Sequence, residues 1–164
     1  MKSRSWFFVL AAALCGALLA GCSPSGVDEE AERVKDAVRA YNEALVRGYA
    51  MMDMDELRGV ATPEQAVKEY TLMSALGEGR ARMVAHLVRI EFGPVRFSEA
   101  TSASVDTTET WDYKHVSLDT SQTIRQESGV VYRLRYELVK SGAVWLVSNI
   151  ISRDEGSASE RTAP

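Results

Sequence analysis

The sequence predicts an α+β domain in which N-terminal helices pack on a curved antiparallel sheet of about four strands. Apolar residues recur every three or four positions before Arg80 and at every second position after it, so helices precede strands. The strands are joined by short connections, which favours antiparallel pairing with the helices on one face. The composition, 46% hydrophobic and 26% charged, is that of a globular protein and excludes a disordered, collagen-like or coiled-coil chain.

A targeting segment occupies the start of the chain. Lys2 and Arg4 precede an apolar stretch of about 15 residues, shorter than the roughly 20 residues that a membrane-spanning helix needs. This arrangement is typical of a secretory signal peptide. The stretch ends in Leu19-Ala20-Gly21-Cys22, which resembles the lipobox of bacterial lipoproteins. The resemblance implies a lipoprotein signal peptide at 1–21 and lipidation of Cys22 with diacylglycerol and palmitate-like chains. The alternative is an ordinary signal peptide in which Cys22 is a bystander.

Lipidation of Cys22 would make membrane lipid a partner of the protein. One acyl chain holds a protein only marginally, whereas the two or three chains of such lipoproteins hold it firmly. Ser23 follows the cysteine, which resembles the outer-membrane sorting choice of two-membrane bacteria. We therefore expect a protein that is lipid-anchored to a membrane of the cell envelope. If the organism has two membranes, it lies on the periplasmic side of the outer membrane.

The rest of the chain divides at changes in composition. Residues 22–26 hold the lipidated cysteine and a short linker, residues 27–153 form one α+β domain, and residues 154–164 form a flexible tail. The other cysteine, Cys15, lies in the removed segment, so we expect a mature domain without thiol catalysis, a disulfide or a thiolate zinc site. A net charge of −4 argues against a basic surface, so we expect no nucleic-acid partner.

Helical patterns fill the first half of the domain. The first helix runs from Val27 to Tyr49, because its apolar side chains recur at steps of three and four and acidic residues fill its first turns. A short second helix or turn covers Met51 to Leu57. The third helix runs from Pro63 to Leu76, with Thr62 as its cap and Gln65 reaching back to that cap. Its expected inner face consists of Val67, Tyr70, Met73 and Ala75 or Leu76.

Alternating patterns after Arg80 predict the strands. The first strand bends at Gly93-Pro94, and one of its sides carries Val84, His86, Val88, Ile90 and Phe92. The second, Ala103 to Val116, places on one face Val105, Thr107, Glu109, Trp111 and Tyr113. The third and fourth strands cover Ile124 to Lys140 and Val144 to Arg153, joined by a tight turn at Ser141-Gly142.

Three late segments carry a resemblance to a known family: the strand at 103–111, the Tyr-x-x-x-Tyr strand at 132–138, and the Gly turn followed by Trp-x-Val at 142–147. In this order they resemble the nuclear transport factor 2-like superfamily, the cystatin-like cone. The layout over residues 27–153 is also similar to the intermembrane-space domain of chloroplast division proteins. The resemblance implies a pocket at the open end of the cone, which enzyme members line with an Asp or His base. The superfamily includes enzymes, adaptors and assembly modules, so the fold implies little about function.

The resemblance makes five residues candidates for the lining of such a pocket: Tyr41, His86, Glu109, Trp111 and Tyr136. Tyr41, together with Asp106 or Glu109, imitates the tyrosine and acid of the superfamily's steroid isomerases. A buried acid can act as a base, and His86 is a second candidate for that role.

Each candidate also has a structural interpretation. His86 and His115 can be satisfied strand histidines, because neither has a partner at metal-ligand spacing. Glu109 can form a cross-strand ion pair with Arg133 or Arg135. The aromatic group can be core packing rather than a pocket wall; it consists of Trp111, Trp145, Tyr132 and Tyr136.

The sequence contains no convincing catalytic constellation, phosphate loop or strained nucleophile turn. We therefore expect an envelope lipoprotein that acts as a non-catalytic binding or scaffold module, with an envelope protein as its partner and no cofactor or metal. Enzymatic activity stays open. The alternative is a small-ligand carrier or a weak hydrolase or isomerase that uses the cone pocket.

Overall fold

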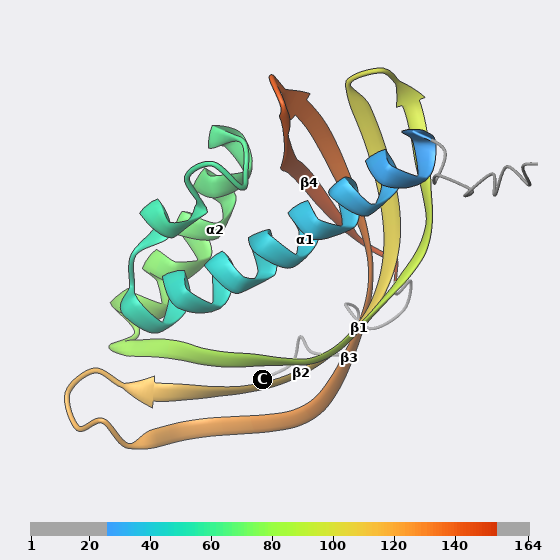
Figure 1. Cartoon of the computed structure of the whole chain (residues 1–164). Helices are drawn as coiled ribbons and strands as arrows, with labels where there is room; N and C mark the ends of the chain where they lie inside the picture. The colour runs from blue at the N-terminus through green and yellow to red at the C-terminus, as the bar shows by residue number, and fades with distance from the viewer. Residues whose placement is uncertain (1–25, 154–164) are drawn as a thin grey trace, which may run out of the picture.

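The computed structural model describes residues 26–153. The predicted signal peptide, the lipidation of Cys22 and the tail at 154–164 lie outside the described residues. The elements follow in the order α1 (Gly26–Met51), η1 (Met54–Leu57, a 3₁₀ turn), α2 (Pro63–Glu78), β1 (Ala81–Glu99), β2 (Ser102–Ser117), β3 (Thr123–Ser141) and β4 (Val144–Ser152) (Figure 1). Among these, no helix combines the length and the apolar character needed to cross a bilayer.

The strands form one antiparallel sheet in the order β1-β2-β3-β4. The sheet curls around α1, and both helices lie on its concave side (Figure 1). The predicted fold class is therefore confirmed, and the short helix or turn expected at Met51 to Leu57 is the 3₁₀ turn η1.

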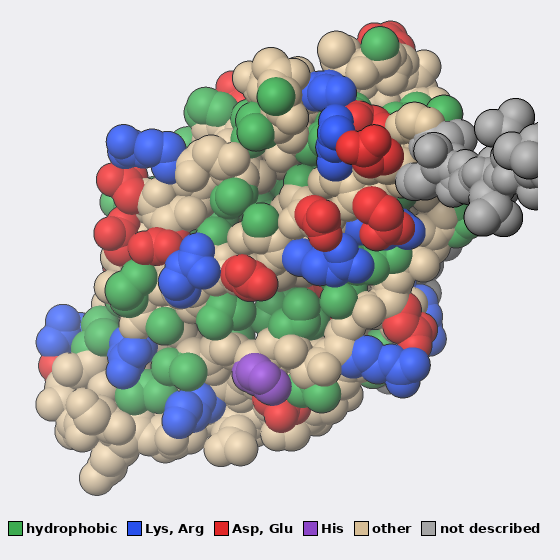
Figure 2. Space-filling model, viewed as in Figure 1, with side chains coloured by type: hydrophobic (Ala, Val, Ile, Leu, Met, Phe, Trp, Pro, Cys, Tyr) green, Lys and Arg blue, Asp and Glu red, His purple; other side chains and the backbone are tan. Residues whose placement is uncertain are grey.

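Helix α1 crosses the concave face and supplies one side of the core. Val34, Val38, Tyr41 and Ala44 are buried at the predicted spacing of three or four residues. Acidic and basic side chains alternate along its exposed side, as Figure 2 shows, and form ion pairs such as Arg39–Asp36. Exposed pairs of this kind contribute little stability, so burial of the apolar row holds the helix on the sheet.

Helix α2 is rotated relative to its prediction. Thr62 caps it, since its Oγ1 accepts the Gln65 backbone N–H at 3.4 Å. The Gln65 side chain does not reach back to the cap but points inward, in a row with Glu69 and Met73, whereas Val67 and Tyr70 are exposed. The predicted inner face is wrong apart from Met73 and the half-buried Leu76, because the pattern counted apolar residues while the inward row begins with two polar ones.

Strand β1 contains a β-bulge that the sequence pattern did not reveal. Leu87 pairs with Trp111 and Arg89 with Thr110, so Val88 is an extra residue and the strand changes sides there. His86 therefore lies on the opposite face from Ile90 and Phe92, which pack against the core. The prediction that these residues share one side is wrong for this reason.

The outer face of the sheet carries a buttressed carboxylate. Asp106 accepts hydrogen bonds from Arg135 Nε at 2.7 Å and from Arg96 Nη1 at 2.8 Å. These guanidinium groups, Arg135 first, hold the pKa of the Asp106 carboxyl well below its usual range. The predicted ion pair between Glu109 and Arg135 is thus wrong, because Arg135 stands opposite Asp106 in the register, and Arg133 stands opposite Thr108 on the same outer face.

Asp106→Asn is expected to lower the free energy of unfolding by about 1 kcal/mol at pH 7, because the half-exposed network is screened by solvent. A carboxyl with a lowered folded-state pKa contributes stability above its unfolded pKa of about 4 and loses it as pH falls through the folded value. The difference between the two proteins should therefore shrink below about pH 4. Urea unfolding at pH 7, 5, 3 and 2 measures it. Asp36→Asn, in an exposed ion pair of α1, is the control and should change the free energy of unfolding little at any pH. If the difference between wild type and Asp106→Asn stays constant down to pH 2, the electrostatic assignment is wrong.

Candidate functional site

A cavity of about 730 Å³ lies between the helices and the concave face of the sheet. Both helices and all four strands contribute to its wall, which is largely apolar and aromatic and includes Leu45, Tyr49, Leu72, Trp111, Leu134 and Ile150. A volume of this size accommodates a small organic molecule or a few side chains of a partner.

A buried carboxylate stands in the cavity wall. Regular alternation along β2 places Thr107, Glu109 and Trp111 on the concave face, and Glu109 is 1% exposed. Its Oε1 accepts hydrogen bonds from Tyr136 Oη at 2.9 Å, Thr107 Oγ1 at 3.1 Å and Asn42 Nδ2 at 3.3 Å. Its Oε2 accepts from Trp111 Nε1 at 2.8 Å. Neutral donors from α1, β2 and β3 thus hold the carboxylate in one orientation.

The hydroxyl of Tyr136 is a permanent donor in this group. Burial, and next the nearby carboxylate of Glu109, raise the pKa of Tyr136 well above its ordinary value. The hydroxyl also lies 3.1 Å from Asn42 Oδ1. Tyr136 therefore stays protonated at neutral pH and fixes Glu109 rather than reacting.

A second carboxylate, Glu69 on α2, is held in a similar way. Its Oε1 accepts from Tyr41 Oη at 2.9 Å and Gln65 Nε2 at 3.0 Å, and its Oε2 accepts from Tyr49 Oη at 3.0 Å. Burial, followed by the charge of Glu69, raises the pKa of both tyrosines far above the ordinary value. Both hydroxyls therefore remain protonated donors that cross-link α1 and α2.

Gln65 leaves one polar atom unused beside the cavity. The residue is 2% exposed, and its Nε2 donates to Tyr41 Oη and to Glu69. Its Oε1 is buried and has no hydrogen-bond partner among residues 26–153. An unpaired buried acceptor of this kind costs about 1–3 kcal/mol.

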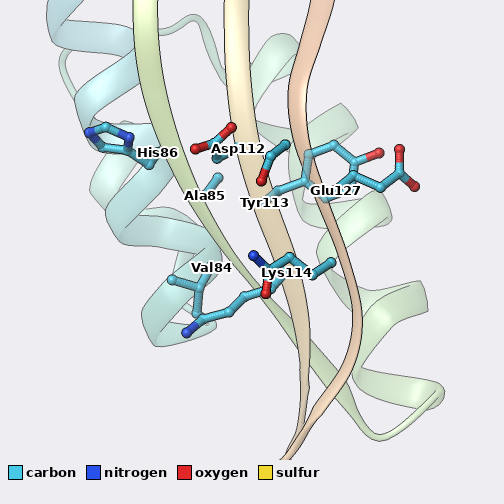
Figure 3. Close-up of a pocket in the computed structure, with 9 residues that line it drawn as sticks. Val84, Ala85, His86, Asp112, Tyr113, Lys114 and Glu127 are labelled. Atoms are coloured by element: carbon cyan, nitrogen blue, oxygen red, sulfur yellow. The ribbon is translucent and has the colours of Figure 1, made fainter.

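The structure brings together only some of the predicted site residues. Glu109, Trp111 and Tyr136 line the cavity. Tyr41 is fully buried and packs its ring against Tyr136 in an edge-on geometry, with centroids 6.2 Å apart, but does not line the cavity. His86 lies on the outer face, in a shallow hollow of about 160 Å³ beside Asp112, Lys114 and Glu127 (Figure 3).

Sequence reasoning missed Tyr49, Gln65 and Glu69 as site residues. The only signals were the place of Tyr49 at the end of the apolar row of α1 and the four-residue spacing of Gln65 and Glu69. His115 also lines the cavity, with its ring tilted against Tyr113 at 6.0 Å. Within the part of the chain that the structure describes, metal-binding side chains do not gather in groups of three or more.

Comparison with known proteins supports the architecture. No protein-family model matches the sequence, and no curated protein is significantly similar to it. Among solved structures, the intermembrane space region of the chloroplast protein ARC6 superposes with a TM-score of 0.65 at 14% identity, covering 74% of this chain and 95% of that one. A ketosteroid isomerase-like protein from Erwinia carotovora atroseptica superposes with a TM-score of 0.53 at 15% identity, covering 76% and 95%. At these identities the likeness shows the fold, and it agrees with the resemblance drawn from the sequence.

Proposed function

We propose that this chain is an envelope lipoprotein whose domain is a non-catalytic binding module, with the cavity between helices and sheet as its binding site. The observation that carries the proposal is the cavity itself, about 730 Å³ with a mainly apolar wall. Its two carboxylates are already held by neutral donors, which suits a preformed, rigid site. The lipobox-like Leu19–Cys22 supports the anchor, and the likeness to an intermembrane space region supports an envelope location.

The wall indicates the chemistry of the occupant. Apolar and aromatic side chains suit an apolar body, and the two carboxylates of the wall, one buried and one half-buried, disfavour an anion. Such an occupant is a small neutral molecule or an apolar segment of an envelope protein partner.

A weak hydrolase or isomerase is the second candidate. One observation favours it: Glu109 is a buried carboxylate in the wall of the cavity, and a buried acid can serve as a base. Against it, Glu109 already accepts four hydrogen bonds from donors of the protein, so its carboxylate has a structural role in the wall. A bound molecule that is released chemically unchanged distinguishes binding from catalysis.

The proposal is tested by comparing the wild-type protein with Cys22→Ala in a bacterial host. We expect the wild type in the membrane fraction and Cys22→Ala in the soluble fraction, because the acyl chains supply the attachment. Soluble Cys22→Ala should still bind the neutral apolar dye N-phenyl-1-naphthylamine saturably, measured by its fluorescence increase. The same location for both proteins contradicts the anchor, and a linear dye response contradicts the binding site.

A matched pair of variants tests whether the dye enters the cavity. Ala85→Phe, in the Cys22→Ala background, places a ring at the cavity wall and should weaken dye binding about tenfold or more, roughly 1.4 kcal/mol. Val84→Phe makes the same addition one residue earlier, on the other face of β1, and should leave binding unchanged. Circular dichroism confirms that both variants are folded. Equal effects of the two substitutions would place the dye elsewhere.

A further inference from the structure

One end of the domain carries exposed apolar side chains beside the start of α1. Val27 in α1 is 65% exposed, Phe97 near the end of β1 is 36% exposed, and Val144 at the start of β4 is 53% exposed. We call Val27 and Phe97 the anchor-end patch; Val144 lies at the same end of the sheet but on its other face, because the neighbouring Trp145 is the residue that Phe97 contacts. The β1–β2 and β3–β4 turns both lie at this end of the sheet, because Ser102 pairs with Glu99 on one side and with Val139 on the other (Figure 1).

The patch is not closed over by the fold. A hollow of about 470 Å³ opens between the first residues of α1 and the β1–β2 turn, lined by Val27, Glu30 and Phe97. The Phe97 ring packs against Trp145, with centroids 6.1 Å apart, and remains partly exposed. Two exposed apolar side chains therefore border an open hollow at this end of the domain.

The start of α1 is fixed to the strands behind the patch. Glu30 Oε1 accepts hydrogen bonds from Lys140 Nζ at 2.5 Å and from Trp145 Nε1 at 2.7 Å. These bonds, the one from Lys140 first, hold the pKa of the Glu30 carboxyl below its usual value. The Lys140 backbone N–H also donates to Thr101 O at 2.8 Å, which joins the β1–β2 turn to β3. Whatever holds the beginning of α1 therefore orients the whole domain.

The distance along the chain identifies what lies next to the patch. Cys22 precedes Gly26, the first residue of α1, by four positions. An extended chain gains at most about 3.5 Å per residue, so the two residues are at most about 14 Å apart. Acyl chains on Cys22 therefore bring the start of α1, and the patch beside it, to the level of the lipid headgroups.

We infer that the anchor-end patch rests on the surface of the bilayer that holds the acyl chains of Cys22, so that the domain stands on the membrane by this end. The inference rests on the proposed lipid anchor. The surface it suits is zwitterionic, because acidic and basic side chains pair at this end, as in Glu29–Arg33 and Glu30–Lys140, whereas anionic lipid attracts clusters of basic residues. The binding cavity is then held away from the membrane, since its wall includes His115 and Arg125, which flank the β2–β3 turn at the opposite end of the sheet.

A single fluorescent label tests this orientation in the full acylated protein, reconstituted into phosphatidylcholine vesicles. After loss of residues 1–21, Cys22 is the only native cysteine and its thiol is alkylated, so Val144→Cys adds one reactive site. A nitrobenzoxadiazole label there should be quenched by headgroup-nitroxide lipid, and iodide in the water should quench it at least about threefold less than a label at Leu118→Cys. Leu118 lies at the β2–β3 turn and is the matched control. Ala100→Cys, in the β1–β2 turn, repeats the test at a second position.

The outcomes separate the inference from the proposed function. Mass spectrometry first establishes whether Cys22 carries acyl chains, and an unmodified Cys22 overturns the proposed lipoprotein together with this orientation. If Cys22 is acylated, equal iodide quenching at positions 144 and 118 overturns the proposed orientation but not the proposed lipid anchor. Protection at 144 and 100, but not at 118, supports the domain standing on its anchor-end patch.

Discussion

Tyr136→Ala is expected to lower the free energy of unfolding by about 3–5 kcal/mol, the usual cost of removing a buried aromatic side chain. Tyr136 is 1% exposed and packs its ring against Tyr41. Its hydroxyl is also the hydroxyl donor nearest to Glu109, at 2.9 Å, so the variant leaves a cavity and an under-satisfied carboxylate. Urea unfolding at pH 7, followed by circular dichroism, measures the change.

Two further variants test whether burial causes this loss of stability and how much of it comes from the hydroxyl. Tyr132→Ala changes the same residue type four positions earlier in β3, where the side chain is 37% exposed, and should cost well under half as much. Tyr136→Phe keeps the ring and removes only the hydroxyl, so it should cost about 1–3 kcal/mol. If Tyr132→Ala is as damaging as Tyr136→Ala, the assignment of Tyr136 to the core that supports the site is wrong.

The regular elements of this domain follow from the sequence because local patterns determine them. The alternation along β2 is unbroken from Ala103 to Trp111, so the pattern alone assigns Glu109 and Trp111 to one face. In β1 the same reasoning fails after Leu87, because a bulge inserts one residue and exchanges the faces. A bulge depends on how two strands pair with each other, so the hydrophobic pattern of one strand alone does not predict it.

The site was less predictable than the fold because polar contacts between distant elements build it. Gln65 and Glu69 face inward through their hydrogen bonds to tyrosines of α1, which no apolar count detects. Likewise, the partner of Arg135 depends on register, and the register sets it opposite Asp106 rather than Glu109. The residue types showed which side chains can donate or accept hydrogen bonds. Which of them pair with one another is decided by contacts between elements that are distant in the sequence.

Alkaline pH is expected to unfold the domain in one cooperative step. Tyr41, Tyr49 and Tyr136 are buried, and burial, followed by the carboxylate of Glu69 or Glu109, raises the pKa of each well above 10. In the unfolded chain these hydroxyls ionise near pH 10, so above that pH the unfolded state releases protons that the folded state retains. A raised folded-state pKa contributes stability that is complete below the unfolded pKa and is lost as pH rises. Each tyrosine should remove about 1.4 kcal/mol per pH unit, or about 4 kcal/mol per unit for the three.

A domain of this size has a free energy of unfolding of about 5–15 kcal/mol. A loss of about 4 kcal/mol per pH unit should therefore bring it to zero within a few pH units above 10. Absorbance at 295 nm, which reports phenolate, and far-UV circular dichroism, which reports secondary structure, should then change together for the buried tyrosines. Tyr49→Phe removes one ionising group. Its unfolding free energy should therefore fall less steeply above pH 10, by about 1.4 kcal/mol per pH unit, although it starts lower at pH 7. Ionisation of all tyrosines while the circular dichroism stays native would contradict the burial of these hydroxyls. The coincidence of the two signals would instead mean that Glu69 and Glu109 keep their tyrosine donors for as long as the domain is folded, which is the condition for a preformed binding cavity.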